Sequence, residues 1–292
     1  MRQAVLYRKL DGNKVRCLAC AHYCVIQNGK TGICGVRKNV EGELQFLVYG
    51  RPAAIHVDPI EKKPLYHFMP GTEILSLGTF GCNFRCGFCQ NYDISQHKLQ
   101  VTSFKLRESG DWLPERIVSY AVGHQIPSIA YTYNEPTVFV EYAHDIMVLA
   151  KEKGIRNVFV SNGYESKETL DYIGPYLDAI NIDLKSFSNE FYQKNCGAKL
   201  QPVLDTIKRV YQMKIWQEIT TLVIPGENDS EEELKQIADF IVSVDSGIPW
   251  HLSRFHPDYK MVDKDITDYK SLARAKEIGL KAGLKYVYIG NV

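Results

Sequence analysis

The sequence predicts an α/β protein, a partial (β/α)6 barrel with a small cysteine-rich appendage at its N-terminus. From Glu73 onward, apolar strand-like segments alternate with helix-like segments, which is typical of a parallel sheet with right-handed crossovers. The chain has 292 residues and 45% hydrophobic content, enough to bury one large core beside a smaller unit. Residues 1–40 show little apolar periodicity and hold four of the eight cysteines. We therefore expect a cysteine-rich metal-binding module and a hairpin over residues 1–71, and the barrel over residues 72–292.

The N-terminal module carries a complete set of four candidate metal ligands. They follow the spacing Cys-x2-Cys-x3-Cys-x9-Cys, at Cys17, Cys20, Cys24 and Cys34. Cysteines clustered at such spacings favour metal sites over disulfides. Four thiolates form a closed site for a structural zinc ion or for a second iron–sulfur cluster, and the spacing does not choose between them. The alternative is four reduced cysteines without a ligand. Partial alternation over Glu43–Asp58 then predicts a short hairpin around Gly50-Arg51-Pro52.

The barrel is expected to contain seven strands and six helices. The strands are predicted near residues 73–81, 128–134, 157–162, 179–185, 215–224, 249–256 and 285–290, and the helices near 114–124, 137–153, 166–177, 199–213, 230–244 and 268–282. Capping residues precede two of the helices, at Asn134-Glu135-Pro136-Thr137 and at Asn228-Asp229-Ser230. Gly154 and Gly283 stand where helices are expected to end. Six βα units predict a partial, TIM-like barrel, whose chemistry belongs at the C-terminal ends of its strands.

The loop after the first barrel strand offers three thiols at close spacing. Cys82, Cys86 and Cys89 form a Cys-x3-Cys-x2-Cys arrangement, with Phe84 and Phe88 between them. Thiolate is the ligand that iron–sulfur clusters prefer, and three ligands to four irons leave one iron open. The alternative is zinc, but zinc usually takes four ligands in paired sets, and this loop offers no fourth. The two aromatic residues are placed to shield a cluster from water. At these residues the chain resembles the radical S-adenosylmethionine (SAM) superfamily, whose loop is Cys-x3-Cys-x-aromatic-Cys.

Polar residues follow five of the later strands. Asp183 and Lys185 point to the same face of one strand, because side chains alternate along a strand with a period of two. Any single polar strand end is explained by a cap or a buried ion pair. Five of them facing one cysteine loop indicate a shared binding site. They lie at Tyr131–Pro136, Val160–Gly163, Ile180–Lys185, Glu218–Thr221 and His251–Pro257.

The resemblance extends over nearly the whole chain. Asp58–Gly71, the cysteine loop with Gln90-Asn91, and Tyr131–Pro136 are similar to the AmmeMemoRadiSam family of radical SAM enzymes, which is related to the pyruvate formate-lyase activating enzymes. This resemblance implies that the catalytic centre is a [4Fe–4S] cluster, and its ligands would be Cys82, Cys86 and Cys89.

The same resemblance implies a binding site for SAM. Asn134-Glu135-Pro136 stands where the superfamily often has Gly-Gly-Glu, so that Glu135, with Asn134 beside it, would bind the amino group of SAM. Ser161 and Asn162 would lie near its ribose. Asp183 and Lys185 match an Asp-x-Lys of the activating enzymes, near the SAM carboxylate and ribose. His256 falls where those enzymes place a histidine beside SAM.

The implied reaction is reductive cleavage of SAM to a 5′-deoxyadenosyl radical, which abstracts a hydrogen atom from a substrate. One hypothesis for the substrate is a partner protein, activated at a backbone glycine as in the glycyl-radical activating enzymes. A second is a small molecule or a nucleotide. A third hypothesis, of another class, is a two-cluster electron carrier, against which the polar strand ends argue. An enzyme of this kind needs an electron donor such as a ferredoxin or a flavodoxin.

Composition limits the partners further. The chain has 35 basic and 34 acidic residues, so bulk charge favours neither nucleic acid nor an anionic membrane. No apolar stretch approaches the roughly 20 residues that span a bilayer. The N-terminus lacks the apolar core and cleavage pattern of a signal peptide. We therefore expect a cytoplasmic location.

Overall fold

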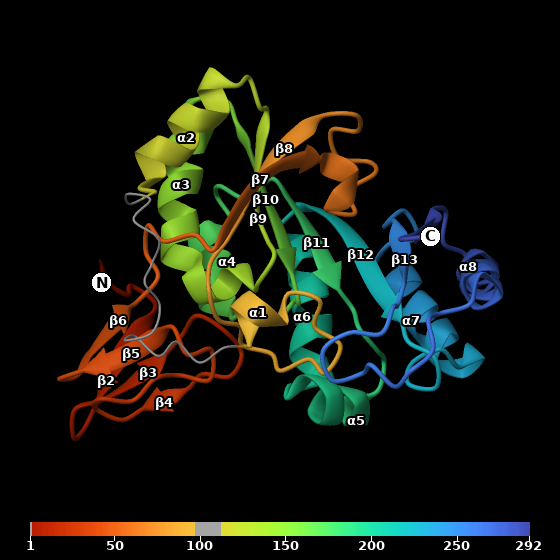
Figure 1. The fold of residues 1–292 in the computed structure, drawn as a ribbon, viewed down its shortest axis with the longest axis horizontal. Helices are drawn as coiled ribbons and strands as arrows, with labels where there is room; N and C mark the ends of the chain where they lie inside the picture. The colour runs from red at the N-terminus through yellow and green to blue at the C-terminus, as the bar shows by residue number, and fades with distance from the viewer. Residues whose placement is uncertain (1, 97–111) are drawn as a thin grey trace.

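One eight-stranded sheet forms the centre of the molecule (Figure 1). The structure is a computed structural model that describes residues 2–96 and 112–292. The strands lie in chain order across the sheet, and β8 to β14 run parallel. These strands are β8 (Glu73–Gly78), β9 (Ser128–Tyr131), β10 (Arg156–Ser161), β11 (Ala179–Asp183), β12 (Trp216–Val223), β13 (Trp250–Arg254) and β14 (Val287–Gly290). An additional strand, β7 (Ala54–Pro59), pairs antiparallel with β8 at one edge.

A helix follows each parallel strand of the described chain except the last. These helices are α2 (Pro114–Gly123), α3 (Val140–Glu152), α4 (Lys167–Ile173), α6 (Leu200–Gln212), α7 (Glu231–Val244) and α8 (Tyr269–Ala282). Side chains cap several of them, as when Ser230 accepts a hydrogen bond from the backbone N–H of Glu233. Gly283 ends α8 in the left-handed conformation, with φ at 110°. The six βα units confirm the predicted partial barrel.

Several shorter elements connect the barrel strands. They are the 3₁₀ turns η1 (Ile60–Lys62) and η2 (Pro136–Phe139), the short helices α1 (Tyr92–Ser95) and α5 (Asn189–Phe191), and the π-helical turn η3 (Tyr192–Cys196). No periodic pattern in the sequence predicts α1, α5 or η3, because each is shorter than two helical turns.

The N-terminal module consists of two small antiparallel sheets. One contains β1 (Arg2–Gln3), β6 (Glu43–Phe46) and β5 (Arg37–Val40), and the other contains β2 (Tyr7–Leu10), β3 (Lys14–Cys17) and β4 (Val25–Ile26). Figure 1 shows these strands in red at one side of the molecule and α8 at the opposite side. The predicted hairpin over 43–58 is wrong. Its first half, β6, pairs with β1 and β5, whereas its second half, β7, pairs over six residues with β8 of the barrel sheet. The division of the chain at residue 71 stays a prediction, with β7 shared by the barrel sheet.

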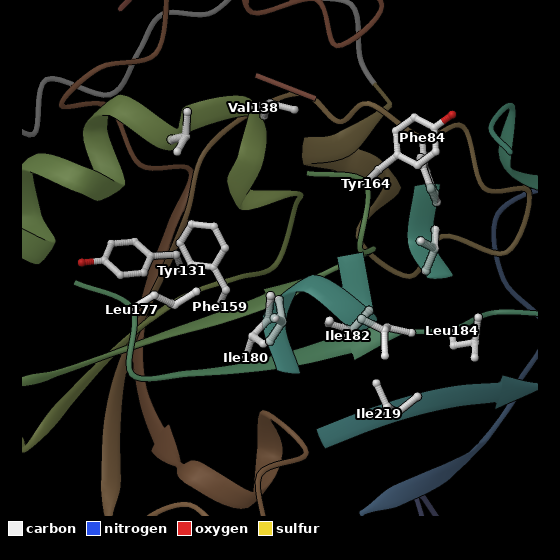
Figure 2. Close-up of a cluster of buried hydrophobic side chains, with 14 of the residues drawn as sticks. Phe84, Tyr131, Val138, Phe159, Tyr164, Leu177, Ile180, Ile182, Leu184 and Ile219 are labelled. Carbon is white, nitrogen blue, oxygen red and sulfur yellow. The ribbon is translucent and has the colours of Figure 1, made fainter. Parts of the chain in front are cut away.

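The apolar core runs from the barrel strands to the cysteine loop. Figure 2 shows Tyr131 and Phe159 side by side, with ring centroids 5.6 Å apart. At the far end of the same cluster, Phe84 of the cysteine loop packs edge-on against Tyr164, at 5.1 Å. These four side chains are at most 2% exposed. Since Phe84 is part of the closely packed core, packing there holds the loop in place.

A buried ion pair joins the N-terminal module to the barrel. Arg37 of β5 donates from Nη1 to Glu141 Oε1 of α3 at 3.0 Å, and Nη2 binds the other carboxylate oxygen. Both side chains are only 2% exposed. The same carboxylate accepts the backbone N–H of Val5 at 3.1 Å, and Arg37 Nε donates to Val138 O at 3.2 Å. Burial opposes ionisation of Glu141, but the guanidinium outweighs it and lowers the pKa of this carboxyl.

We predict that Arg37→Met destabilises the protein by about 3–5 kcal/mol, because it leaves Glu141 charged, buried and without its cation. Urea denaturation followed by circular dichroism measures the loss. The control is Arg37→Met/Glu141→Leu, which removes both charges and is expected to recover most of the stability. A single variant as stable as the wild type would show that the pair does not anchor the module.

Candidate active site

The cysteine loop leaves the C-terminal end of β8 and is held on several sides. Gly81 donates its backbone N–H to Ile94 O at 2.8 Å. Arg85 and Gly87 donate theirs to Cys196 O and Asn195 O of the π-helical turn η3, at 2.8 and 3.0 Å. Gly81 has a φ of 83°, and a Cβ on it would lie 2.4 Å from Cys34 O. Only glycine fits this position, where the loop touches the N-terminal module.

Asn134 fastens the same loop from β9. Its Nδ2 donates to Gly81 O at 2.7 Å, and its Oδ1 accepts the backbone N–H of Thr79 at 2.9 Å. The amide of Asn134 therefore positions the start of the cysteine loop. Tyr133, beside it, is held at a φ of 70°. That conformation is uncommon for an aromatic residue and is concentrated at functional sites.

A cleft opens over the C-terminal ends of the barrel strands. It encloses about 1180 Å³ of space including its mouth, and its lining includes Thr220, Leu222 and Ser253 of the later strands. Nine of the ten site residues predicted from the sequence line it: Cys82, Cys86, Cys89, Asn134, Glu135, Ser161, Asn162, Asp183 and Lys185. The tenth, His256, is not among the lining residues. Its Nε2 lies 2.9 Å from the side-chain nitrogen of Gln90, which does line the cleft.

Glu135 forms the acidic wall of the cleft and is 3% exposed. Its Oε1 accepts from the backbone N–H and the hydroxyl of Thr137, at 3.0 and 2.6 Å, and contacts Ser161 Oγ at 3.0 Å. Its Oε2 accepts one hydrogen bond, from the backbone N–H of Asn162 at 2.8 Å. Because a carboxylate oxygen has two lone pairs, Oε2 keeps the capacity to accept another donor.

A second buried carboxyl group, Glu165, shares the hydroxyl of Ser161. Ser161 Oγ lies 2.5 Å from Glu165 Oε1 and 3.0 Å from Glu135 Oε1. One hydroxyl has one proton to donate. Both contacts are hydrogen bonds when Glu165 is protonated and donates to Ser161 Oγ, which then donates to Glu135, while Glu165 Oε2 stays buried without a partner in the described structure. Burial raises the pKa of Glu165 to about 8, and the negative charge of Glu135 adds to the effect. Sequence reasoning missed Glu165, since a lone acid after a strand end carries no motif.

Lys185 and Asp183 form a charged pair in the same cleft. Lys185 Nζ lies 2.8 Å from Asp183 Oδ2, and the lysine side chain is 13% exposed. Burial disfavours its charge, but the negative charge of Asp183 outweighs burial and raises the pKa of Lys185. The ammonium also lies 5.7 Å from the ring centroid of Phe88. Lys185 is therefore a fixed cation beside the cysteine loop.

Cys196 is a further residue that the sequence did not single out. It is fully buried at the end of η3, and a hydrogen bond between it and Cys86 lowers the pKa of the Cys86 thiol. An isolated cysteine more than 100 positions along the chain offers no spacing from which this contact follows. Phe84 and Phe88, at 1% and 4% exposure, are packed beside the three cysteines as expected of a shield, and their shielding role stays a prediction.

The donor set of the cleft fits a cluster better than a single metal ion. In residues 2–96 and 112–292, no three His, Cys, Asp or Glu side chains converge on a site for one ion. Zinc usually takes four protein ligands, whereas this loop supplies three thiols, the ligand that iron–sulfur clusters prefer. Three thiols that line one cleft beside an acceptor and a cation therefore suit an iron–sulfur cluster with a charged organic ligand.

Comparison with known families agrees with this combination of a partial barrel and a three-cysteine loop. Residues 76–241 match the family model of the Radical SAM superfamily. The chain belongs to the radical SAM superfamily, which implies a [4Fe–4S] cluster and SAM as cofactors.

Relatives of the chain extend the comparison. It is 44% identical over 293 residues to the uncharacterized protein MJ0808 of Methanocaldococcus jannaschii, covering 100% of this chain and 86% of that protein. It is 27% identical over 226 residues to the putative glycyl-radical enzyme activating enzyme MJ1632 of the same organism, covering 75% and 79% of the two chains. A solved domain of pyruvate-formate lyase-activating enzyme from Bacteroides vulgatus shares the fold, with a TM-score of 0.50, 23% identity and coverage of 56% of this chain and 98% of that one.

None of the helices in the described parts of the chain is long and apolar enough to cross a lipid bilayer.

The carboxyl pair predicts a pH dependence of stability. The folded-state pKa of Glu165 is raised above its unfolded value, so its contribution to stability is lost as pH rises toward 8, at up to about 1.4 kcal/mol per pH unit. Glu165→Gln, which cannot ionise, should flatten the decline. Urea unfolding of both proteins between pH 5 and 8 measures the difference in slope. Equal slopes would mean that Glu165 ionises as easily in the fold as in water.

Proposed function

We propose that this chain is a radical SAM activating enzyme that abstracts a hydrogen atom from a partner protein. The observation that carries the proposal is the cleft itself, where three thiols, a carboxylate with a spare acceptor position and a buried cation meet. Bound together, the [4Fe–4S] cluster and SAM supply a 5′-deoxyadenosyl radical when one electron is delivered from a donor such as a ferredoxin or a flavodoxin.

Each wall of the cleft has a separate task in this proposal. Cys82, Cys86 and Cys89 hold the cluster. Glu135 Oε2 accepts a hydrogen bond from the SAM ammonium, which is a charge-assisted bond in a sheltered position. Lys185 attracts the SAM carboxylate, with Asp183 holding the ammonium of Lys185 in place.

The remaining predicted residues lie where they can orient the nucleoside. Ser161 ends β10 and Asn162 follows it, both in contact with Glu135, and we assign them to the ribose. Phe84 and Phe88 exclude water behind the cysteines, which protects a reactive radical from side reactions. His256 acts through Gln90 at the rim rather than in the cleft lining.

A protein substrate is supported by the family relationship and by the shape of the barrel. A relative that matches 75% of this chain is named a putative glycyl-radical enzyme activating enzyme. The sheet ends at β7 and β14, which do not pair with each other in the described structure. An open barrel leaves room for a peptide loop to reach the cleft, whereas a closed one would restrict access to small molecules.

We also assign the chain to the AmmeMemoRadiSam family, on the three segments whose sequence resembles it. The fold brings them together, because Lys62 and Lys63, Gln90 and Asn91, and Thr132 to Glu135 all line one cleft. Asp58 links two of these segments. It accepts a hydrogen bond from Tyr133 Oη at 3.2 Å and forms an ion pair with Lys63 Nζ at 2.8 Å. The many reduced thiols fit the cytoplasm, where we expect the enzyme to act.

The proposed function is tested by anaerobic reconstitution, followed by incubation with SAM, a reductant and a deuterium-labelled extract of the source cells. We expect deuterium to appear in 5′-deoxyadenosine when the protein fraction of the extract is added. Cys82→Ala, Cys86→Ala and Cys89→Ala should each lose SAM cleavage, because each removes one of three cluster ligands. Tyr92→Phe, which lies outside the cleft, is the matched control.

Two results would contradict the proposal. Label that arrives only from the small-molecule fraction would replace the protein substrate with a small molecule or nucleotide. Full cleavage activity in any one of the three cysteine variants would remove that cysteine from the cluster.

Glu135→Gln and Lys185→Met test the SAM site. Loss of a charge-assisted hydrogen bond costs about 1.5–3 kcal/mol, so each variant should weaken SAM binding by roughly one to two decades while the cluster spectrum is unchanged. Equilibrium binding to the reconstituted protein measures the affinity, with the unfolding midpoint recorded in parallel. In Glu135→Gln, the NH2 group of glutamine would face the backbone N–H of Asn162 or Thr137. Because two donors then face each other, this variant is also expected to be less stable.

Lys185→Met separates the two effects, since methionine adds no donor and Asp183, whose side chain is 34% exposed, stays solvated without its partner. If both variants bind SAM as the wild type does, Glu135 and Lys185 contribute to the stability of the fold and not to SAM binding.

A further inference from the structure

The four N-terminal cysteines lie around one cavity. Cys17 ends β3, and Cys20, Cys24 and Cys34 lie on the loops that follow it. All four thiols are free of disulfides, and all four line the same small cavity, together with apolar side chains and the polar residues Arg37, Asn83 and Thr137. Backbone hydrogen bonds fix the loops, as between Cys17 N and Cys24 O at 3.0 Å. Thiols brought together without disulfides form a ligand set for a thiophilic group.

A structural zinc ion would use the same four thiols, so the donor set alone admits both groups. The neighbouring thiols Cys82, Cys86 and Cys89 belong to a loop whose family uses a [4Fe–4S] cluster, and the two cysteine sets meet at Asn83. Four cysteine ligands are the usual set for an iron–sulfur cluster.

Asn83 supplies an independent sign of a ligand in this cavity. Its side chain is fully buried, lines the cavity, and has no hydrogen-bond partner in the described structure for Nδ2. Rotating the amide by 180° does not remove the problem. Asn162 Oδ1 accepts the backbone N–H of Tyr164, so Asn162 Nδ2 is the donor to Asn83, and the accepting atom of Asn83 must be Oδ1, at 2.8 Å.

The orphaned N–H group needs an acceptor, because leaving a buried donor unpaired costs about 1–3 kcal/mol. The sulfur atoms of an iron–sulfur cluster accept such hydrogen bonds, which tune its reduction potential. Asn83 thus has an unpaired buried donor beside a cavity lined by four cysteines, and a sulfur-containing ligand in that cavity would satisfy the donor.

The cavity also touches the active-site loop. Asn83 directly follows Cys82, and its carbonyl oxygen lies 2.9 Å from Nε2 of His22, within the N-terminal cysteine segment. On the other side, the carbonyl of Cys34 packs against Gly81. The two cysteine sets therefore meet across residues 81–83, with one asparagine between them.

We propose that Cys17, Cys20, Cys24 and Cys34 bind a second iron–sulfur cluster, which Asn83 contacts by a hydrogen bond and joins to the loop of the radical SAM cluster. The proposal does not depend on the substrate or on SAM binding. It assigns the N-terminal module the role of holding a redox centre directly behind the active-site loop.

The experiment uses the full chain with Cys82, Cys86 and Cys89 all changed to alanine, reconstituted anaerobically with iron and sulfide in the presence of equimolar zinc. We expect iron and acid-labile sulfide in equal amounts, at about two or more atoms of each per chain, together with an electron paramagnetic resonance signal after reduction. About one zinc per chain without sulfide would overturn the proposal, and so would a folded chain without metal.

Two further variants in the same background test the cavity. Cys20→Ala/Cys24→Ala should lose the remaining iron, whereas Ile33→Ala, which lines the cavity without a sulfur atom, should retain it. Retention of all iron by the double cysteine variant would overturn the ligand assignment.

The role of Asn83 has its own readout. Asn83→Ala should move the reduction potential of the remaining cluster to more negative values, because a hydrogen bond to sulfur stabilises the reduced state, and Ile33→Ala should leave the potential unchanged. An unchanged potential in Asn83→Ala would remove Asn83 from the site.

The outcome is separable from the proposed function. A chain that keeps the second cluster while the wild type fails to cleave SAM contradicts only the enzyme assignment. A chain that cleaves SAM but holds no second cluster contradicts only this inference.

Discussion

The fixed position of the cysteine loop is the constraint on which the rest of the site depends. A chain segment with three thiols and two glycines has little regular structure of its own, so its shape is imposed by neighbours. The amide of Asn134 holds its start, the π-helical turn η3 holds its middle, and Phe84 inserts into the core beside Tyr164. Each attachment comes from a different part of the chain. The loop is therefore formed only when the barrel is complete, and the binding site is a product of the whole fold.

Buried charge shapes the site in a second way. Glu135 and Glu165 lie on the two sides of one serine hydroxyl, which hydrogen-bonds to both when Glu165 carries a proton. Burial and the like charge push the pKa of Glu165 far above that of a free carboxylic acid, which leaves Glu135 as the ionised member. In the proposed SAM site, Glu135 then accepts a hydrogen bond from a cationic group, while Asp183 keeps Lys185 charged. An anion and a cation in one cleft suit the zwitterionic end of SAM in that proposal.

The sequence predicted the barrel well because its strands and helices carry strong local signals. Helix α7 begins at Glu231, one residue after the predicted boundary, since Ser230 and the following acids form a cap. Nine of ten site residues line one cleft because parallel strands deliver their C-terminal ends to the same edge. The hairpin that was predicted wrongly shows that sequence patterns identify strands better than they identify which strands pair. Strand β7 has the alternation expected of a hairpin partner, but pairing depends on which sheet edge is nearby, and the edge of β8 offers a longer match than β6. Cys196 and Asn83 were missed because their partners are far along the chain, and Glu165 because a lone acid after a strand end carries no motif.

Asn83 shows how such long-range contacts link the parts of the molecule. Its Oδ1 is bound by Asn162 at the end of β10, its carbonyl oxygen by His22 of the N-terminal module, and its backbone continues from Cys82. One residue thus connects the barrel, the appendage and the cysteine loop. Its side chain lines the cavity of the other four cysteines, and its Nδ2 has no partner in the described structure. A purely structural appendage would be joined to a barrel more simply, through apolar contacts and the Arg37–Glu141 pair. Burying a polar junction with an unpaired donor costs free energy. In the proposed second-cluster site this cost is offset, because a sulfur atom of the cluster accepts the hydrogen bond from Asn83.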